Sequence, residues 1–128
     1  MSQIKTYKDL IVWQRSMDLV VKTCELMRTF PDSEKFSLIN QIQRAAVSVP
    51  ANIAEGYGRS PKSYSHYLVI SRSSLNELET ELLLANRINY LDDAILNEFE
   101  EEITQIGKML TKLIYKVKSC DQGLNPNS

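Results

Sequence analysis

Residues 41–59 read QIQRAAVSVPANIAEGYGR, and this stretch decides the fold because its apolar residues keep helical spacing although a proline interrupts them. Pro50 removes one backbone hydrogen bond and clashes with the carbonyl of Ala46, at a cost of about 3 kcal/mol or more. The apolar positions on both sides of it still mark one helix face: Leu38, Ile39, Ile42, Ala46, Val49 and Ile53. We therefore predict a helix that is kinked at Pro50.

An earlier helix is expected from Asp9 to Met27, and it carries two apolar lines. The line assigned to the core recurs at steps of three and four: Leu10, Trp13, Met17, Val20, Cys24 and Met27. A second line on a neighbouring face repeats every seven residues: Val12, Leu19 and Leu26. A helix with two apolar faces buries more than one side, so we expect it to pack in its own bundle and against a second chain.

Capping and turn residues predict two further helices. Asp32 or Ser33 is placed to cap the helix around Pro50, and Gly56-Tyr57-Gly58 ends that helix. Ser60-Pro61 opens a third helix that runs to about Asn89. Apolar spacing marks the fourth: Phe99, Ile103, Ile106, Leu110, Leu113 and Val117. Short turns between amphipathic helices predict an all-α, antiparallel up-down-up-down four-helix bundle over residues 1–119, followed by a disordered tail over 120–128.

Composition narrows the class of protein. A chain of 128 residues with 43% hydrophobic and 24% charged residues fits one soluble domain. Because no apolar run approaches the ~20 residues needed to span a bilayer, we expect no membrane association and a cytoplasmic location. Cys24 and Cys120 lack metal-ligand spacing, so we interpret both as reduced. A net charge of −1 argues against a surface wholly devoted to nucleic acid.

A polar line crosses the proline at steps of four, four, three and four: Arg44, Ser48, Asn52, Glu55 and Arg59. One interpretation is a contact to a ligand, a nucleic acid or another subunit. The other is a solvated face with an internal Arg–Glu pair that contributes only ~0.3–0.5 kcal/mol. Asn52 is also placed to hydrogen-bond the Ala46 carbonyl that Pro50 leaves free. We predict that Asn52 and Glu55 are mostly buried in a polar network.

The rival hypothesis is an enzyme that uses carboxylates. Glu55, Glu77, Glu79 and Glu81 supply acid–base groups, but no nucleophile accompanies them at a suggestive position. A di-metal bundle needs inward Glu-x-x-His motifs, and the single histidine, His66, follows Ser63 instead. The run Ser71-Arg72-Ser73-Ser74 lacks a base and is interpreted as helix packing with one charged partner. We predict no enzyme activity, no cofactor and no metal.

A second candidate site is basic. Lys108, Lys112 and Lys116 follow one another at steps of four on the last helix, which suits a stripe that tracks phosphates. The alternative is an ordinary solvated helix face, because four glutamates precede the stripe and no Gly-rich phosphate loop accompanies it. Trp13 lies on an expected core line, which favours packing over base stacking.

Several segments resemble the four-helix-bundle family encoded in intervening sequences of bacterial 23S ribosomal RNA genes. The matching segments are residues 7–14 (YKDLIVWQ), 30–34 (FPDSE), 44–59 (RAAVSVPANIAEGYGR) and 74–80 (SLNELET). The resemblance implies a left-handed bundle that assembles into a homopentamer. It also implies kinship with the accessory variability proteins of diversity-generating retroelements, which are pentamers that associate with nucleic acid and a reverse transcriptase.

Together these patterns predict a non-enzymatic homo-oligomeric scaffold with RNA, DNA or protein as its partner. The expected polar framework or interface is Arg44, Asn52, Glu55, Arg59 and Glu79. The expected phosphate contacts are Arg59, Lys108, Lys112 and Lys116. The alternative is a purely structural or protein-binding homo-oligomer without affinity for nucleic acid, and the third hypothesis is a hydrolase that uses Glu55.

Overall fold

The computed structural model describes residues 3–121, and this part of the chain is helical without a strand. Four long helices follow one another: α1 (Ile11–Met27), α2 (Leu38–Gly56), α3 (Pro61–Arg87) and α4 (Asp93–Asp121). Two 3₁₀ turns, η1 (Tyr7–Asp9) and η2 (Asp32–Glu34), precede α1 and α2. The all-α class with four helices is confirmed.

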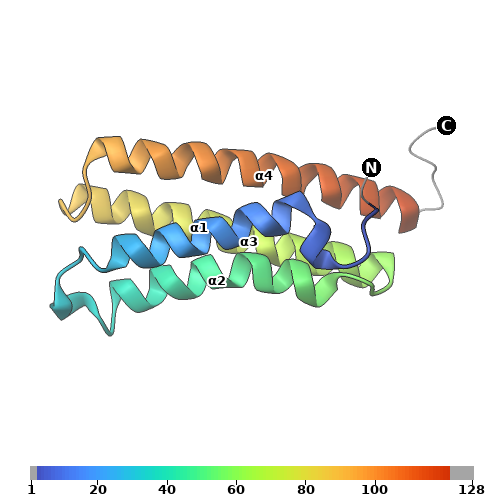
Figure 1. Ribbon diagram of the computed structural model, residues 1–128, viewed down its shortest axis with the longest axis horizontal. Coiled ribbons are helices and arrows are strands. Elements are labelled where there is room, and N and C mark those ends of the chain that lie inside the picture. The colour runs from blue at the N-terminus through green and yellow to red at the C-terminus, as the bar shows by residue number, and fades with distance from the viewer. Residues whose placement is uncertain (1–2, 122–128) are drawn as a thin grey trace.

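The helices lie side by side, and successive helices run in opposite directions along the bundle (Figure 1). α2 packs against α1 and α3, α3 packs against α4, and α1 closes the arrangement against α4. Among the described residues the backbones of the diagonal pairs, α1 with α3 and α2 with α4, do not approach each other as those of neighbouring helices do. The helix α2 continues through Pro50, which is buried. The kink at Pro50 and the left-handed twist stay predictions.

The closest packing in the bundle is between α2 and α3, where small residues meet. Ala45, Ala46 and Gly56 of α2 are buried, and a Cβ atom added to Gly56 would lie 2.6 Å from the Cβ of Tyr67. The buried Ser71 hydroxyl of α3 donates a hydrogen bond to the Val49 carbonyl across 2.8 Å. Small side chains thus let the two backbones approach each other.

The core face of α1 differs from the predicted one. The buried residues are Val12, Ser16, Leu19, Thr23, Leu26 and Met27, whereas Met17 is exposed and Leu10, Trp13, Val20 and Cys24 are only partly buried. Ser16 and Thr23 are buried because their hydroxyls donate to the carbonyls of Val12 and Leu19, at 2.6 and 2.7 Å. A hydroxyl that donates its hydrogen bond to a carbonyl of its own helix can be buried among apolar side chains. Ser16 and Thr23 therefore fill the gaps between Val12, Leu19 and Leu26 on the buried face of α1.

The observed helix ends differ from the predicted ones in three places. Neither Asp32 nor Ser33 caps α2, because both belong to η2 and α2 begins only at Leu38 after Ser37. α3 ends at Arg87 instead of Asn89, whose φ of 67° turns the chain. α4 includes Cys120 and Asp121, and the rest of the predicted tail, 122–128, lies outside the described residues.

Other predicted ends are confirmed. The Ser60 side chain accepts a hydrogen bond from the Ser63 backbone N–H, and Pro61 occupies the first turn of α3. Gly58 has a φ of +82°, a conformation that residues with a Cβ rarely adopt, in the turn between α2 and α3. Within residues 3–121, no helix combines the length and the apolar character that a bilayer crossing requires.

Candidate functional site

The polar line of α2 meets α3 in a small hydrogen-bonded cluster. The amide of Asn52 donates to the carbonyl and to the hydroxyl of Ser48, at 2.8 and 2.9 Å. The Ser48 hydroxyl in turn lies 2.8 Å from the Ser74 hydroxyl of α3. Asn52 is partly buried, and its partner is Ser48 and not the predicted Ala46 carbonyl. The cluster links two helices through side chains that satisfy one another.

The other end of the line does not enter this cluster. Arg59 donates to Glu55 at 2.7 Å, and their side chains remain 47% and 57% exposed. The Arg59 guanidinium also lies 5.0 Å from the ring centroid of Tyr67. The prediction that Glu55 is buried is wrong for the described chain, because Ile53 and Gly56 occupy the inward positions of this turn. Glu55 and Arg59 form the solvated pair of the simpler interpretation.

Arg44 and Glu79 lie apart, because Arg44 is between α2 and α3 whereas Glu79 faces α4. Arg44 is exposed and lines a groove of about 340 Å³ between α2 and α3, with Gln41, Ser48 and Glu77. Glu79 instead lies beside Glu100 of α4 and raises the pKa of that carboxyl group. Ser74 also lines the groove, so Arg44 lies beside the cluster of Asn52, Ser48 and Ser74. The five predicted framework residues therefore form three separate arrangements and not one site: Arg44 with Asn52, Glu55 with Arg59, and Glu79 by itself.

Two pairs of carboxyl groups have unusual acid–base properties. Glu81 is only 8% exposed, and burial raises the pKa of its carboxyl to about 7, with the charge of Glu77 and a hydrogen bond to Glu77 acting in the same direction. The hydrogen bond to Glu79, together with burial, raises the pKa of Glu100 to about 7. Two carboxyl groups can hydrogen-bond only when one holds a proton, so each pair retains a proton up to near neutral pH.

A metal site would need a third ligand beside one of these carboxyl pairs. Within residues 3–121, no three side chains of His, Cys, Asp or Glu gather as a metal site would require. His66 is exposed and packs edge-on against the ring of Tyr67, with 5.8 Å between the ring centroids.

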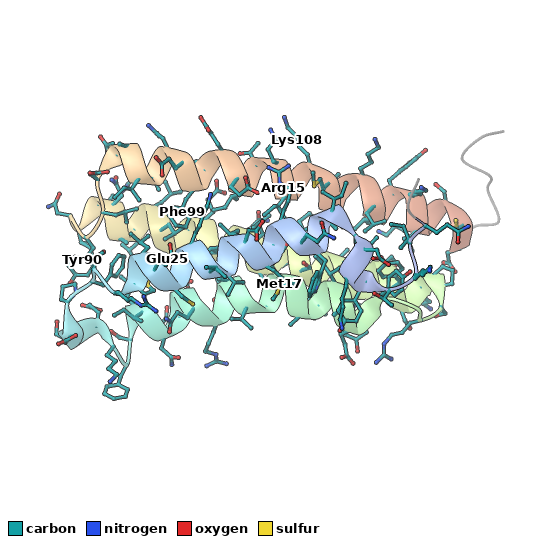
Figure 2. The ribbon with its side chains drawn as sticks, in the orientation of Figure 1. Arg15, Met17, Glu25, Tyr90, Phe99 and Lys108 are labelled. Carbon is teal, nitrogen blue, oxygen red and sulfur yellow. The ribbon has the colours of Figure 1, made fainter. Side chains whose placement is uncertain are left out.

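A basic groove runs between α3 and α4. Arg72 of α3 lies there with Lys108 and Lys112 of α4, and Tyr115 stands at one side with 73% of its surface exposed. Figure 2 shows Lys108 pointing outward from α4. The sequence pattern identified both lysines but not Arg72 or Tyr115. Tyr115 could have been predicted from the sequence, because it follows Lys112 by three residues and so lies on the same face of the helix. Arg72 could not, because only the packing of α3 against α4 brings it to the lysines.

The remaining predicted phosphate contacts lie elsewhere. Lys116 is exposed one turn beyond Lys112 but does not line the groove. Arg59 lies beyond the end of α2 and forms an ion pair with Glu55, and the backbone of α2 does not come close to that of α4. The groove therefore unites two of the four predicted contacts.

An uncovered apolar surface follows the outer side of α1. Met17 and Val21, one turn apart, are 40% and 55% exposed, and the partly buried Trp13, Val20 and Cys24 extend this surface. Figure 2 shows Met17 on the side of α1 next to α2. We call Trp13, Met17, Val20, Val21 and Cys24 the α1 outer face.

The geometry defines the class of the protein as an all-α four-helix bundle whose candidate sites are surfaces along its helices. The family model described as 23S rRNA-intervening sequence protein matches residues 8–112. The chain belongs to this family. No protein with a curated description matches it. A solved structure is also similar: a protein with unknown function from the S23 ribosomal protein family of Bacteroides thetaiotaomicron. The two are 27% identical with a TM-score of 0.75, over 81% of this chain and 98% of the other.

Proposed function

We propose that this protein is a non-enzymatic scaffold that assembles with copies of itself in the cytoplasm and associates with nucleic acid. The observation that carries the proposal is the α1 outer face, because Met17 and Val21 stay exposed there beside Trp13 and Val20, which pack partly against the core. Fully burying an exposed Val or Met side chain contributes about 1.5–3 kcal/mol. Met17 and Val21 have 40% and 55% of their surface left to bury, so each supplies about half of that gain for self-association.

The form of the assembly is proposed from a resemblance. We propose a homopentamer because the chain resembles a family for which kinship with the pentameric accessory variability proteins of diversity-generating retroelements is expected. The expected mass is then five times the 14.7 kDa of one chain. The α1 outer face supports self-association in general, and the number of subunits rests on the kinship.

The nucleic-acid partner is supported by the basic groove, which gathers three cationic side chains in a protein whose net charge is only −1. Cations that gather on one face supply the phosphate contacts from which most nucleic-acid affinity arises.

Salt-dependent fluorescence anisotropy with labelled RNA and DNA tests the partner class. We expect binding that weakens as salt rises, because each phosphate contact releases counterions. Binding that is absent even at low salt would remove the nucleic-acid partner. The remaining candidate, a purely structural or protein-binding homo-oligomer, is favoured by the α1 outer face alone.

A further inference from the structure

The groove between α3 and α4 differs in charge from the rest of the surface. Eight residues line it, and Arg72, Lys108 and Lys112 are the charged ones. No acidic residue is among the eight, although the chain has 16 Asp and Glu against 15 Lys and Arg. The Arg72 guanidinium donates to the Thr111 hydroxyl at 3.4 Å, which keeps it over the groove. An anion in this groove meets three positive charges and no repulsion from the lining.

The groove also offers uncharged contacts. Asn76, Thr104 and Thr111 add an amide and two hydroxyls to its lining. Gly107 is also part of the lining and adds no side chain to it. Tyr115, with 73% of its surface exposed, presents its ring beside the cations. Cations, hydrogen-bonding groups and an exposed ring along one groove match the chemistry of a nucleotide chain.

We propose that this groove binds single-stranded nucleic acid, with phosphates on Arg72, Lys108 and Lys112 and a base stacked on Tyr115. The inference rests on the proposed function and assigns it a site and a substrate class. Stacking on a side chain requires an unpaired base, because a duplex hides its base faces. Lys116, about 6 Å further along α4 at 1.5 Å per residue, extends the path of the strand.

The competing occupant of the groove is the acidic half of α4 from a second copy. Glu98 and Glu101 are exposed near the start of α4, so two antiparallel copies would bring glutamates to lysines. An unstructured strand fits better for one reason. Contact between two charged helices gives no role to the exposed ring of Tyr115, whereas base stacking does.

The test measures anisotropy of labelled single strands of about 12 nucleotides, oligouridine and oligothymidine, and of a hairpin duplex as competitor. For three phosphate contacts we expect a slope of about −2 in log affinity against log salt, at roughly 0.7 per contact. The two strands separate RNA from DNA. A duplex that binds as tightly as the single strands would overturn the single-strand assignment.

Variants locate the site. Lys108→Gln with Lys112→Gln is expected to reduce the slope to about −0.7. Tyr115→Ala is expected to weaken binding about tenfold without changing the slope, and Tyr115→Phe to retain wild-type affinity. Lys35→Gln is the matched control, since Lys35 is an exposed lysine in the α1–α2 connection, at the opposite end of the bundle from the last turns of α4 (Figure 1).

The possible failures are distinguishable. If the wild-type protein binds no strand at low salt, the nucleic-acid part of the proposed function falls together with this inference. If the wild type binds and the Lys108, Lys112 and Tyr115 variants bind equally well, only the groove is wrong. If Lys108→Gln with Lys112→Gln lowers the mass of the assembly, the groove is a subunit contact and the inference is overturned.

Discussion

The hydroxyls of Ser48 on α2 and Ser74 on α3 lie 2.8 Å apart, and Asn52 donates to Ser48 from one turn away. A neutral hydrogen bond of this kind contributes about 1 kcal/mol to stability. We expect Ser48→Ala to lower the free energy of unfolding by about 1 kcal/mol, because Ser74 and Asn52 each lose a partner. Urea denaturation of the single and double Ser48 and Ser74 variants measures the coupling.

The control for this cycle is Ser73→Ala, since Ser73 is exposed on the same helix. We expect it to change stability by less than about 0.5 kcal/mol. Strictly additive effects of Ser48→Ala and Ser74→Ala would show that the two hydroxyls do not interact in solution.

A pair of glycine substitutions tests the close approach of α2 to α3. A Cβ on Gly56 would lie 2.6 Å from the Cβ of Tyr67, whereas one on Gly107 of α4 meets a side chain at 3.7 Å. We expect Gly56→Ala to destabilise the protein by roughly 1–3 kcal/mol through overpacking. Gly107→Ala should stabilise it by roughly 0.5–1 kcal/mol, because alanine favours a helix interior. Thermal and urea unfolding that gave both changes the same sign would contradict the packing described.

The buried carboxyl of Glu81 predicts how stability depends on pH. Its pKa is about 7 in the folded protein and about 4.5 without the fold, so the folded state holds the extra proton between these values. Stability therefore falls as pH rises from about 5 to 7 and is level above that range. Each unit of pKa shift corresponds to about 1.4 kcal/mol, so we expect an effect on the order of 2 kcal/mol. Glu100, with its pKa raised in the same direction, adds to it.

Glu81→Gln separates this contribution from the rest. The amide has no charge to bury, so we expect the variant to be more stable than the wild type at pH 8 and to show a shallower loss of stability between pH 5 and 7. Glu98→Gln is the control at an exposed carboxylate of α4. Chemical denaturation across this pH range gives the answer, and a wild-type stability that increased from pH 5 to 7 would refute the explanation.

The number, order and approximate ends of the helices were predictable because apolar spacing and turn residues are local signals. The core face of α1 was not, since Ser16 and Thr23 are buried with hydroxyls bonded to their own helix and so look like surface residues in the sequence. Glu55 was assigned to the interior on its spacing from Asn52, but Ile53 and Gly56 take the inward positions of that turn. The errors about the core face of α1 and about Glu55 have the same cause: the sequence does not tell which face of a helix packs against another helix.

The basic groove could be predicted only in part, because it is formed by residues of two helices that are far apart in the sequence. The spacing of Lys108 and Lys112 indicated a stripe, yet Arg72 is 36 positions before Lys108 and joins it only because α3 packs against α4. The pairing of Glu79 with Glu100 has the same origin. Sites formed between helices depend on which helices are neighbours, and that information is tertiary.

The central claim is self-association through the α1 outer face. Substitutions that introduce charged side chains on that face test it. Met17→Glu with Val21→Glu places two carboxylates on the exposed line, where burial in a contact would be costly. Leu84→Glu is the matched control, because Leu84 is 50% exposed on α3. Helical circular dichroism should remain for both, since none of these side chains belongs to the buried core.

Light scattering after size-exclusion chromatography at micromolar concentration is the most direct measurement. We expect the wild type to show several times 14.7 kDa, five times if it is a pentamer, and the Met17 and Val21 double variant to show a smaller mass while Leu84→Glu keeps the larger one. A wild-type protein of 14.7 kDa, or an assembly that only Leu84→Glu dissociates, would contradict the account.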